Sequence, residues 1–328
     1  MNGLGTGPTA RGPRRDLRAL KLLMVGAVAL LSGCVEHGVT FMSPAGPVAA
    51  AQRDHFWQVT WISMIVVLPV IIGVPLLAWH YRYGNSKARY SPNWDFSHAL
   101  EWVMWLVPAA VVVVLSVLLW DNTHKLDPYR KIAAAKPPLQ VQVVGLDWKW
   151  LFIYPEYHVA TVGEMAFPQD RPVELTLTTD TVMQSFMISA LGGQIYAMPG
   201  MTTKLNLVAD HVGHFDGDNT QYNGDGFADQ HFTAVAMTKG DFDAWLSKVQ
   251  NDGVALNTLA YAKLGQSTTP EQVRAEFGTQ AMPPHVTYFN DVPSGLFSNI
   301  VNRYHSGAPV HAAQQPGSVA YNAQKLGE

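Results

Sequence analysis

Two long apolar runs, joined by a short polar segment, constrain this chain more than any other feature. The first lies within residues 59–83 and the second within residues 100–120. Each has about the 20 residues that a helix needs to cross the hydrocarbon core of a bilayer. We therefore expect a hairpin of two transmembrane helices over residues 56–120, with helices at about 58–83 and 99–120. The segments before and after such a hairpin lie on the same side of the membrane.

The charges of the connecting loop predict the orientation of the hairpin. The loop carries Arg82, Lys87 and Arg89 against a single carboxylate, Asp95. Because basic loops are retained in the cytoplasm, both flanks of the hairpin are expected to be exported. Tryptophan and tyrosine residues near the ends of both runs are typical of membrane interfaces.

Residues 1–33 have the pattern of an export signal. A basic stretch between Arg11 and Lys21 precedes a short apolar core, which ends in Leu31-Ser32-Gly33-Cys34. Small residues directly before a lone cysteine resemble the lipobox of bacterial lipoproteins, in which the cysteine is acylated and becomes the new N-terminus. We expect Cys34 to be a lipidation site, with an unmodified cysteine as the alternative. Residues 34–55 are then an exported, extended linker.

The charge balance and the cysteine count exclude several classes of function. The formal net charge is −3 at pH 7, which gives no electrostatic footprint for nucleic acid. Cys34 is the only cysteine in the sequence. The chain therefore forms no internal disulfide, and it supplies no metal site that needs two thiolates.

The sequence after the hairpin predicts an exported domain that is mainly β. A linker at residues 121–138 comes first, and turn residues occur at 192–193, 199–200 and 223–224. Several short strands without long helices between them indicate a β-sandwich, which we place at residues 139–249. The clearest strand patterns are at residues 139–144, 173–178, 204–208 and 232–237.

Helical signals return toward the C-terminus. A helix is expected after Lys239-Gly240, with Asp241 as its cap, and residues 250–304 are expected to form a helical arm. Within this arm, Thr269-Pro270-Glu271-Gln272 has the form of a capping box, and residues 296–304 predict a last short helix. The tail at 305–328 is rich in Ala, Gln, Gly and Pro, which predicts disorder.

Several local sequences resemble subunit II of the haem–copper oxidases. DWKWLFIYP at 147–155 resembles the tryptophan-rich segment of that family, and LGGQIYAMPGM at 191–201 resembles the loop after its first copper-ligand histidine. The resemblance is closest to cytochrome bo-type ubiquinol oxidases, and it implies that the sandwich is cupredoxin-like. Further matching segments are residues 90–94, 98–101, 288–290, 296–297 and 300–302.

In the cytochrome c-oxidising members of the family, the sandwich holds a dinuclear copper centre. Its ligands come from a His-Ser-aromatic motif and a C-x-E-x-C-x-x-x-H-x-x-M loop, because mixed-valence copper needs thiolates and imidazoles. None of the side-chain ligands that the motif specifies is kept here. The resemblance therefore implies that this chain binds no copper and no other cofactor, and that the haems and copper belong to a partner, subunit I. The corresponding positions are Gln184, Asn219, Gln221, Asn223, Phe227 and Gln230.

A stretch rich in histidine and aspartate is the other candidate metal site. An H-x-x-H pair can bind zinc, but nothing in the sequence brings these side chains together. A calcium-loop pattern is broken at Thr220-Gln221. We interpret the stretch as a polar surface loop and predict no metal there. Its residues are His211, His214, Asp216 and Asp218, followed by His231.

Trp148 and Trp150 lie in the segment that helps electrons enter the copper-containing relatives. Without copper there is no acceptor beneath them. Aromatic residues two positions apart in a strand share a face and usually pack. We therefore predict a structural role for both, at a contact with the catalytic subunit.

Glu101 is the residue expected to take part in the chemistry. It stands at the start of the second apolar run, and an ionisable residue in a membrane span indicates function. The resemblance places it at the mouth of a proton pathway into subunit I. The alternative is an interfacial carboxylate that only reaches the lipid headgroups.

Together these features predict a non-redox subunit of a proton-pumping ubiquinol:oxygen oxidoreductase in a bacterial inner membrane. Its partners would be subunit I, further small membrane subunits and membrane lipid, with ubiquinol as the substrate of the complex and no role for cytochrome c. The missing ligands exclude a cytochrome c oxidase subunit. The alternative from another class is a stand-alone membrane lipoprotein whose sandwich binds a ligand or a partner.

Overall fold

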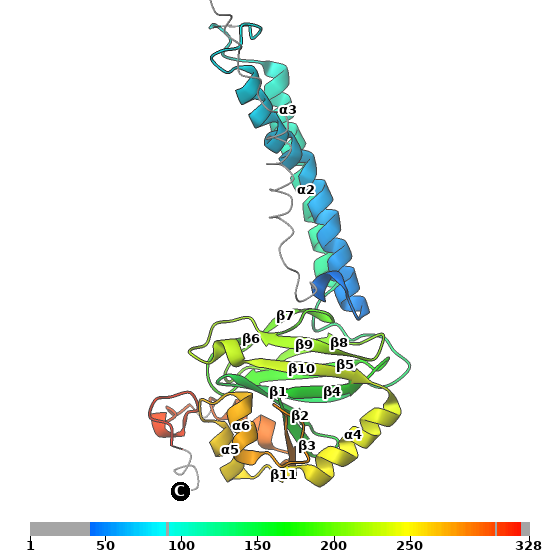
Figure 1. Ribbon diagram of the computed structural model, residues 1–328, viewed down its shortest axis with the longest axis vertical. Coiled ribbons are helices and arrows are strands. Elements are labelled where there is room, and N and C mark those ends of the chain that lie inside the picture. The colour runs from blue at the N-terminus through cyan, green and yellow to red at the C-terminus, as the bar shows by residue number, and fades with distance from the viewer. Residues whose placement is uncertain (1–39, 90–91, 306, 323–328) are drawn as a thin grey trace, which may run out of the picture. The chain divides into compact units, whose positions relative to one another are not determined.

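The computed structural model describes residues 40–89, 92–305 and 307–322 (Figure 1). A short 3₁₀ helix, η1 (Thr40–Met42), comes first and is followed by two long helices, α2 (Pro47–His80) and α3 (His98–Lys125). The predicted export signal and the predicted lipidation site, Cys34, lie outside the described residues.

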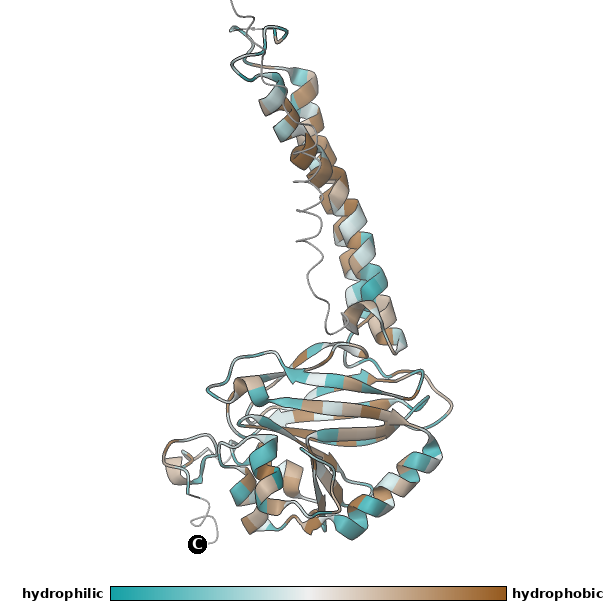
Figure 2. Ribbon diagram, viewed as in Figure 1, coloured by the Kyte–Doolittle hydropathy of each residue, from teal (hydrophilic) through white to brown (hydrophobic). Residues whose placement is uncertain are grey.

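Both long helices have the length and composition to cross a membrane. Figure 2 shows apolar residues along most of α2 and α3. With 34 residues, α2 is about 51 Å long, which exceeds the hydrocarbon core of a bilayer by about 20 Å. Part of α2 therefore extends beyond the core and into the interface.

The helices are longer than the apolar runs predict. Helix α2 begins at Pro47, inside the stretch expected to be an extended linker, because proline suits the first helical position and three alanines follow it. Helix α3 continues to Lys125, beyond the predicted end at 120. Lys125 pairs with Asp121 one turn earlier at 2.6 Å, which supports the polar last turn.

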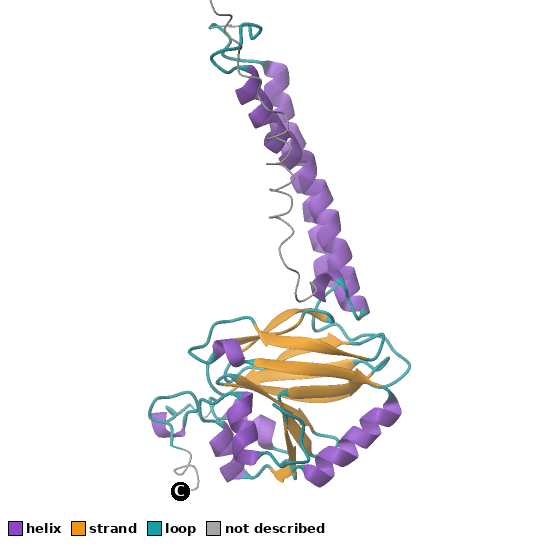
Figure 3. Ribbon diagram, viewed as in Figure 1, coloured by secondary structure: helices purple, strands orange, loops and turns teal. Residues whose placement is uncertain are grey.

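The domain that follows α3 consists of two β-sheets, which Figure 3 shows as strands packed face to face. The seven-stranded sheet has the order β11 (Val254–Ala255), β12 (Thr287–Asn290), β3 (Val159–Val162), β2 (Lys149–Tyr154), β1 (Leu139–Leu146), β5 (Val173–Thr179) and β8 (Thr203–Leu207). The five-stranded sheet has the order β4 (Glu164–Pro168), β10 (His231–Met237), β9 (Gly213–Asn219), β6 (Gln184–Ile188) and β7 (Gly192–Ala197).

The core between the sheets is aromatic at its centre. The ring of Phe186 stacks on Phe232 at 5.1 Å and meets Trp150 edge-on at 5.2 Å. The four predicted strand stretches coincide with β1, β5, β8 and β10, except that Val208 lies one residue beyond the end of β8. The predicted turn at 192–193 is wrong, because both glycines belong to β7.

The C-terminal arm is not purely helical. After α4 (Lys239–Asp252), it contains α5 (Thr258–Leu264), α6 (Pro270–Phe277) and α7 (Leu296–Asn302), but β11 and β12 also extend the larger sheet through pairing of β12 with β3. Thr238 caps α4 by accepting from the backbone N–H of Asp241, so the predicted cap at Asp241 is wrong. The predicted capping box of Thr269 and Gln272 is present.

The described part of the tail packs on the domain instead of being disordered as predicted. A 3₁₀ helix, η3 (Ala312–Gln314), lies within it. The hydroxyl of Tyr321 donates to the carbonyl of Ala262 at 2.6 Å, and Pro316 is buried. The tail contains few large apolar residues, so its composition predicts disorder although these few contacts order it.

Candidate functional site

Strand pairing gathers most of the positions that the resemblance aligns with copper ligands at one end of the smaller sheet. Gln184 opens β6, Asn219 closes β9, and Gln230 directly precedes β10. Strand β9 pairs antiparallel with both β6 and β10, so these ends lie next to each other. The loop between β9 and β10 carries Asn223 and the 3₁₀ helix η2 (Phe227–Asp229).

Four amide side chains from these positions form one hydrogen-bonded network. The side-chain oxygen of Gln230, Oε1, accepts from Asn219 Nδ2 at 2.9 Å and from Asn223 Nδ2 at 2.7 Å. Gln230 Nε2 donates to Gln184 Oε1 at 2.7 Å. Gln184 Nε2 in turn donates to the carbonyl of Leu146 at 3.0 Å. Gln184 and Gln230 are completely buried, so these bonds replace solvation by water.

Asn219 also organises the backbone around the network. Its Oδ1 accepts from the N–H groups of Ser185 at 2.9 Å and Gln221 at 3.1 Å. The side chains of Gln221 and Phe227 are not part of the network, and Phe227 instead packs against Tyr222 at 5.6 Å. Four of the six predicted positions therefore come together through their side chains.

The network does not have the chemistry of a copper site. Its groups are neutral, hard amides that are already engaged with one another, whereas mixed-valence copper needs soft thiolates and imidazoles. Within the described residues there is no group of three or more His, Cys, Asp or Glu side chains placed to hold a metal ion.

Trp148 and Trp150 differ in position from the prediction. Trp148 lies in the turn between β1 and β2 with φ of +66°, and Trp150 lies in β2. They do not share a strand face as predicted. The Trp148 ring covers the backbone of Gly224 and Gly226, where a Cβ at Gly226 would overlap the ring. Trp150 belongs to the aromatic core. Trp148 therefore packs against the loop between β9 and β10, and Trp150 packs between the sheets.

Lys149, between these tryptophans, is a buried cation that the sequence analysis missed. Its Nζ donates to the carbonyls of Asp147 (3.0 Å), Gln266 (2.8 Å) and Thr268 (2.9 Å), and to the hydroxyl of Thr268. Burial lowers its pKa from 10.5 to about 7, and the charge of Asp147 opposes this shift. No sequence signal distinguishes this lysine from an exposed one in the same strand.

Asp180 is the second buried charge that sequence patterns did not reveal. Its carboxylate accepts from the hydroxyls of Tyr261 at 2.7 Å and Tyr304 at 2.9 Å, and it pairs with Arg303 at 3.0 Å. Burial raises the pKa of Asp180, while Arg303 and the two tyrosines oppose the shift. These contacts join α5 and the end of the arm to the sandwich.

The His- and Asp-rich stretch is a strand and not the loop that was predicted. His214, Asp216 and Asp218 alternate along β9, and His211 precedes it with its ring near Phe215. His231 Nδ1 lies 2.7 Å from Asp218 Oδ1. Burial lowers the pKa of His231, but the hydrogen bond and charge of Asp218 outweigh it, and the pKa is raised.

Glu101 lies in the first turn of α3. Its backbone N–H donates to the carbonyl of Ser97 at 3.0 Å, and its side chain is half-buried. A carboxylate at this position interacts favourably with the positive end of the helix dipole.

Comparison with known proteins gives the family. No protein-family model matches the sequence. The chain is 43% identical over 296 residues to "Cytochrome bo(3) ubiquinol oxidase subunit 2" of Pseudomonas aeruginosa, which covers 90% of this chain and 85% of the relative. This chain belongs to the ubiquinol oxidase subunit 2 family. A second relative, "Ubiquinol oxidase subunit 2" of Acetobacter aceti, is 38% identical and covers 88% of this chain and 90% of the relative.

The resemblance seen in the sequence is thus confirmed, as is the architecture of two apolar helices followed by a β-sandwich with short C-terminal helices. Among solved structures, the periplasmic domain of subunit II of a cytochrome oxidase of Bradyrhizobium japonicum is similar. It has a TM-score of 0.33 and 21% identity, and it covers 35% of this chain and 95% of that domain.

Proposed function

We propose that this chain is a non-redox subunit of a ubiquinol:oxygen oxidoreductase. Its relatives in the family are named as ubiquinol oxidase subunits. The observation that carries the proposal is the amide network, because Gln184, Asn219, Asn223 and Gln230 satisfy one another where copper ligands would have to stand.

The energetics of the network oppose metal binding. A metal at this position would have to displace buried amide–amide hydrogen bonds, each worth about 0.5–1.5 kcal/mol net and about 1–3 kcal/mol when a buried group is left unpaired. The new metal–amide contacts would be hard and neutral, so they would not compensate with copper. The network therefore acts as a structural substitute that keeps the loop between β9 and β10 closed.

A quinol as electron donor would explain why the sandwich needs no dinuclear copper centre. Quinols are carried in the membrane, so their electrons need no relay through an exported domain. The haems and copper would belong to subunit I. This chain would contribute α2 and α3 to the complex, with further small membrane subunits, and the sandwich would cover the complex on the periplasmic face of the inner membrane.

Two further residues complete the proposal. Cys34 would carry acyl chains in the outer leaflet, in agreement with the orientation that Arg82, Lys87 and Arg89 predict. Glu101 would collect protons from the cytoplasm and pass them through water to subunit I. An ionisable side chain in a membrane span supports such a role.

The test is to extract the tagged full-length chain gently from its native membrane. Haem absorbance, copper content and oxygen uptake are then measured with ubiquinol and with reduced cytochrome c as electron donors. We expect haem in the preparation, uptake driven by ubiquinol, no uptake driven by cytochrome c, and no mixed-valence copper signal by electron paramagnetic resonance.

Other outcomes would each contradict a defined part of the proposal. Rapid uptake with cytochrome c together with a mixed-valence copper signal would show that the sandwich holds a redox centre. An intact preparation without haem and without oxygen uptake would instead support the stand-alone lipoprotein.

A further inference from the structure

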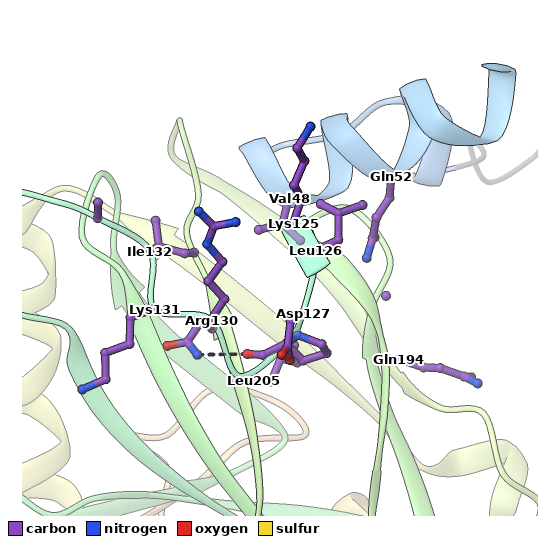
Figure 4. A pocket seen from close by; sticks show the side chains of 14 residues that line it. Val48, Gln52, Lys125, Leu126, Asp127, Arg130, Lys131, Ile132, Gln194 and Leu205 are labelled. Atoms are coloured by element: carbon purple, nitrogen blue, oxygen red, sulfur yellow. Dashed lines mark hydrogen bonds between the residues drawn. The ribbon is translucent and has the colours of Figure 1, made fainter. Parts of the chain in front are cut away.

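A pocket with a basic lining lies where α2 and α3 meet the sandwich (Figure 4). Its volume is about 240 Å³. That is below the roughly 300–1,000 Å³ of sites that enclose whole small molecules, so it suits a polar headgroup better than a complete ligand. The polar side chains that line it are Gln52, Lys125, Asp127, Arg130, Lys131, Gln194 and Asn206.

Backbone hydrogen bonds hold the walls of this headgroup pocket in place. Just before α2, the N–H of Ala45 donates to the carbonyl of Ala190 at 2.7 Å, and the carbonyl of Ala45 accepts from the N–H of Asp210 at 2.9 Å. After α3, the carbonyl of Pro128 accepts from both the backbone N–H (3.1 Å) and the side chain (2.9 Å) of Asn206. Hydrogen bonds of the fold itself therefore fix the shape of the pocket.

The lining carries more positive than negative charge. Three cations, Lys125, Arg130 and Lys131, stand against one carboxylate, Asp127. Asp127 accepts from the backbone N–H of Tyr129 at 2.9 Å. Since a zwitterionic headgroup brings its own cation, the excess positive charge favours a ligand that is a net anion.

Arg130 supplies the least compensated of these charges. Lys125 already forms an ion pair with Asp121 at 2.6 Å. The charge of Lys131 interacts with the carboxylate of Glu174, which itself pairs with Lys204 at 3.0 Å. Arg130 is exposed, and among the described residues no carboxylate lies within ion-pair distance of its guanidinium.

The depth of the pocket matches the phosphate layer of a membrane. Lys125 follows the interfacial Trp120 by five residues of helix, and Gln52 precedes the interfacial Trp57 by the same number. At 1.5 Å per residue each lies about 7.5 Å beyond its tryptophan. The headgroup region is about 5–8 Å thick on each side of the hydrocarbon core, so both helices place the pocket at the same level.

We propose that this pocket binds the phosphate of an anionic phospholipid, with Arg130 and Lys131 as the main electrostatic contacts. The lipid tails would run along the exposed apolar side chains of α2 and α3, among them Trp61 and Leu119. The inference rests on the two helices crossing a membrane. It is independent of the proposed absence of copper and of the role of Glu101.

The test is lipid binding to the extracted full-length chain with its accompanying subunits, measured by native mass spectrometry. The probes are phosphatidylglycerol, phosphatidylcholine with the same acyl chains, and inorganic phosphate. In the variant Arg130→Gln/Lys131→Gln, we expect phosphatidylglycerol to bind one site about thirtyfold more weakly, because each cation near an anionic lipid contributes roughly fivefold.

Two control variants make the test specific. Lys239→Gln/Lys248→Gln removes the same charge from α4, which contacts β12, β3 and β4 and not the headgroup pocket, and it should bind phosphatidylglycerol like the wild type. Arg130→Lys/Lys131→Arg keeps the charge and should also retain binding. Both exchanged residues are exposed, so folding should be unaffected.

Three results would overturn the proposal. Equal binding of phosphatidylglycerol and phosphatidylcholine to the wild type would show that the pocket does not select an anion. Equal loss of phosphatidylglycerol in the α4 control would show a general charge effect. Competition by inorganic phosphate at the same concentration as the lipid would show a site for a free anion and not for a lipid headgroup.

Discussion

At the scale of single residues, Gln230 is the centre of the amide network. It is the common partner of Asn219, Asn223 and Gln184. Exchange of Gln230 for methionine keeps the length of the side chain but leaves those three amides short of a partner. We expect the free energy of unfolding to fall by about 3 kcal/mol, since each unpaired buried group costs about 1–3 kcal/mol. The thermal midpoint of the domain should fall by about 6–12 °C.

Gln221 provides the matched control for this prediction. It lies in the same loop, but its side chain is outside the network, so Gln221→Met should shift the midpoint by only a small amount. Calorimetry of the detergent-extracted protein measures both variants. Equal shifts would mean that the loop, and not the network, determines the stability.

The lowered pKa of Lys149 should make the stability of the domain depend on pH. Its pKa is about 7 in the folded chain and 10.5 ordinarily, so between these values the unfolded chain holds a proton that the folded chain has released. Stability should therefore rise with pH across this window, by up to about 1.4 kcal/mol per pH unit. In Lys149→Met this rise should be absent, and denaturant unfolding between pH 7 and 10 would measure it.

The exposed Lys248 gives the corresponding control, and Lys248→Met should keep the pH dependence of the wild type. The same dependence in Lys149→Met would assign it to other groups. Lysine at 149 could not be recognised in advance, because its role depends on the carbonyls of Gln266 and Thr268, more than a hundred residues away in the chain.

At the scale of structural elements, Asp180 attaches the C-terminal arm to the sandwich. Asp180→Asn would leave Arg303, which is only one-fifth exposed, without its charge partner. We expect a loss of about 3 kcal/mol, the low end of the cost of removing one member of a buried pair. Hydrogen exchange should then become faster in α5 and α7 and stay unchanged in β1 and β5.

The exposed Asp210 is a suitable control, since Asp210→Asn removes a carboxylate that faces solvent. Its exchange rates should equal those of the wild type. Faster exchange throughout the sandwich of Asp180→Asn would show that Asp180 stabilises the whole domain and does not act as a local clamp.

The elements also show how far local sequence patterns reach. Short runs rich in apolar residues located β1, β5, β8 and β10, because this signal is local in the sequence. The ends of α2 and α3 were missed, because polar turns can continue a helix beyond its apolar run. The positive φ of Trp148 was missed as well, since it depends on packing against a loop far along the chain.

At the scale of the whole molecule, the family resemblance located the amide network but not its bonding. The sequence alignment to a copper motif identified six positions, and four of them meet through their side chains. Which amide donates and which accepts is set by strand register between β6, β9 and β10, a property that no local pattern contains.

Glu101 carries the last prediction, which concerns the complex as a whole. If it collects protons for oxygen reduction, Glu101→Ala should slow ubiquinol-driven oxygen uptake several-fold while the ratio of haem to protein stays unchanged. The loss should be smaller at low pH, where a higher proton concentration compensates for a missing collector. Oxygen uptake of the purified complex between pH 6 and 9 measures this.

Asp95→Asn is the matched control, because Asp95 is an exposed carboxylate shortly before the same helix and should be replaceable. Glu101 could also have a purely structural role, because a carboxylate at the N-terminus of α3 stabilises the helix through its dipole. Glu101→Gln separates the two: it keeps the shape of the side chain but cannot carry a proton, so its uptake should match that of Glu101→Ala. Normal uptake in Glu101→Gln across the whole pH range would leave only the structural use.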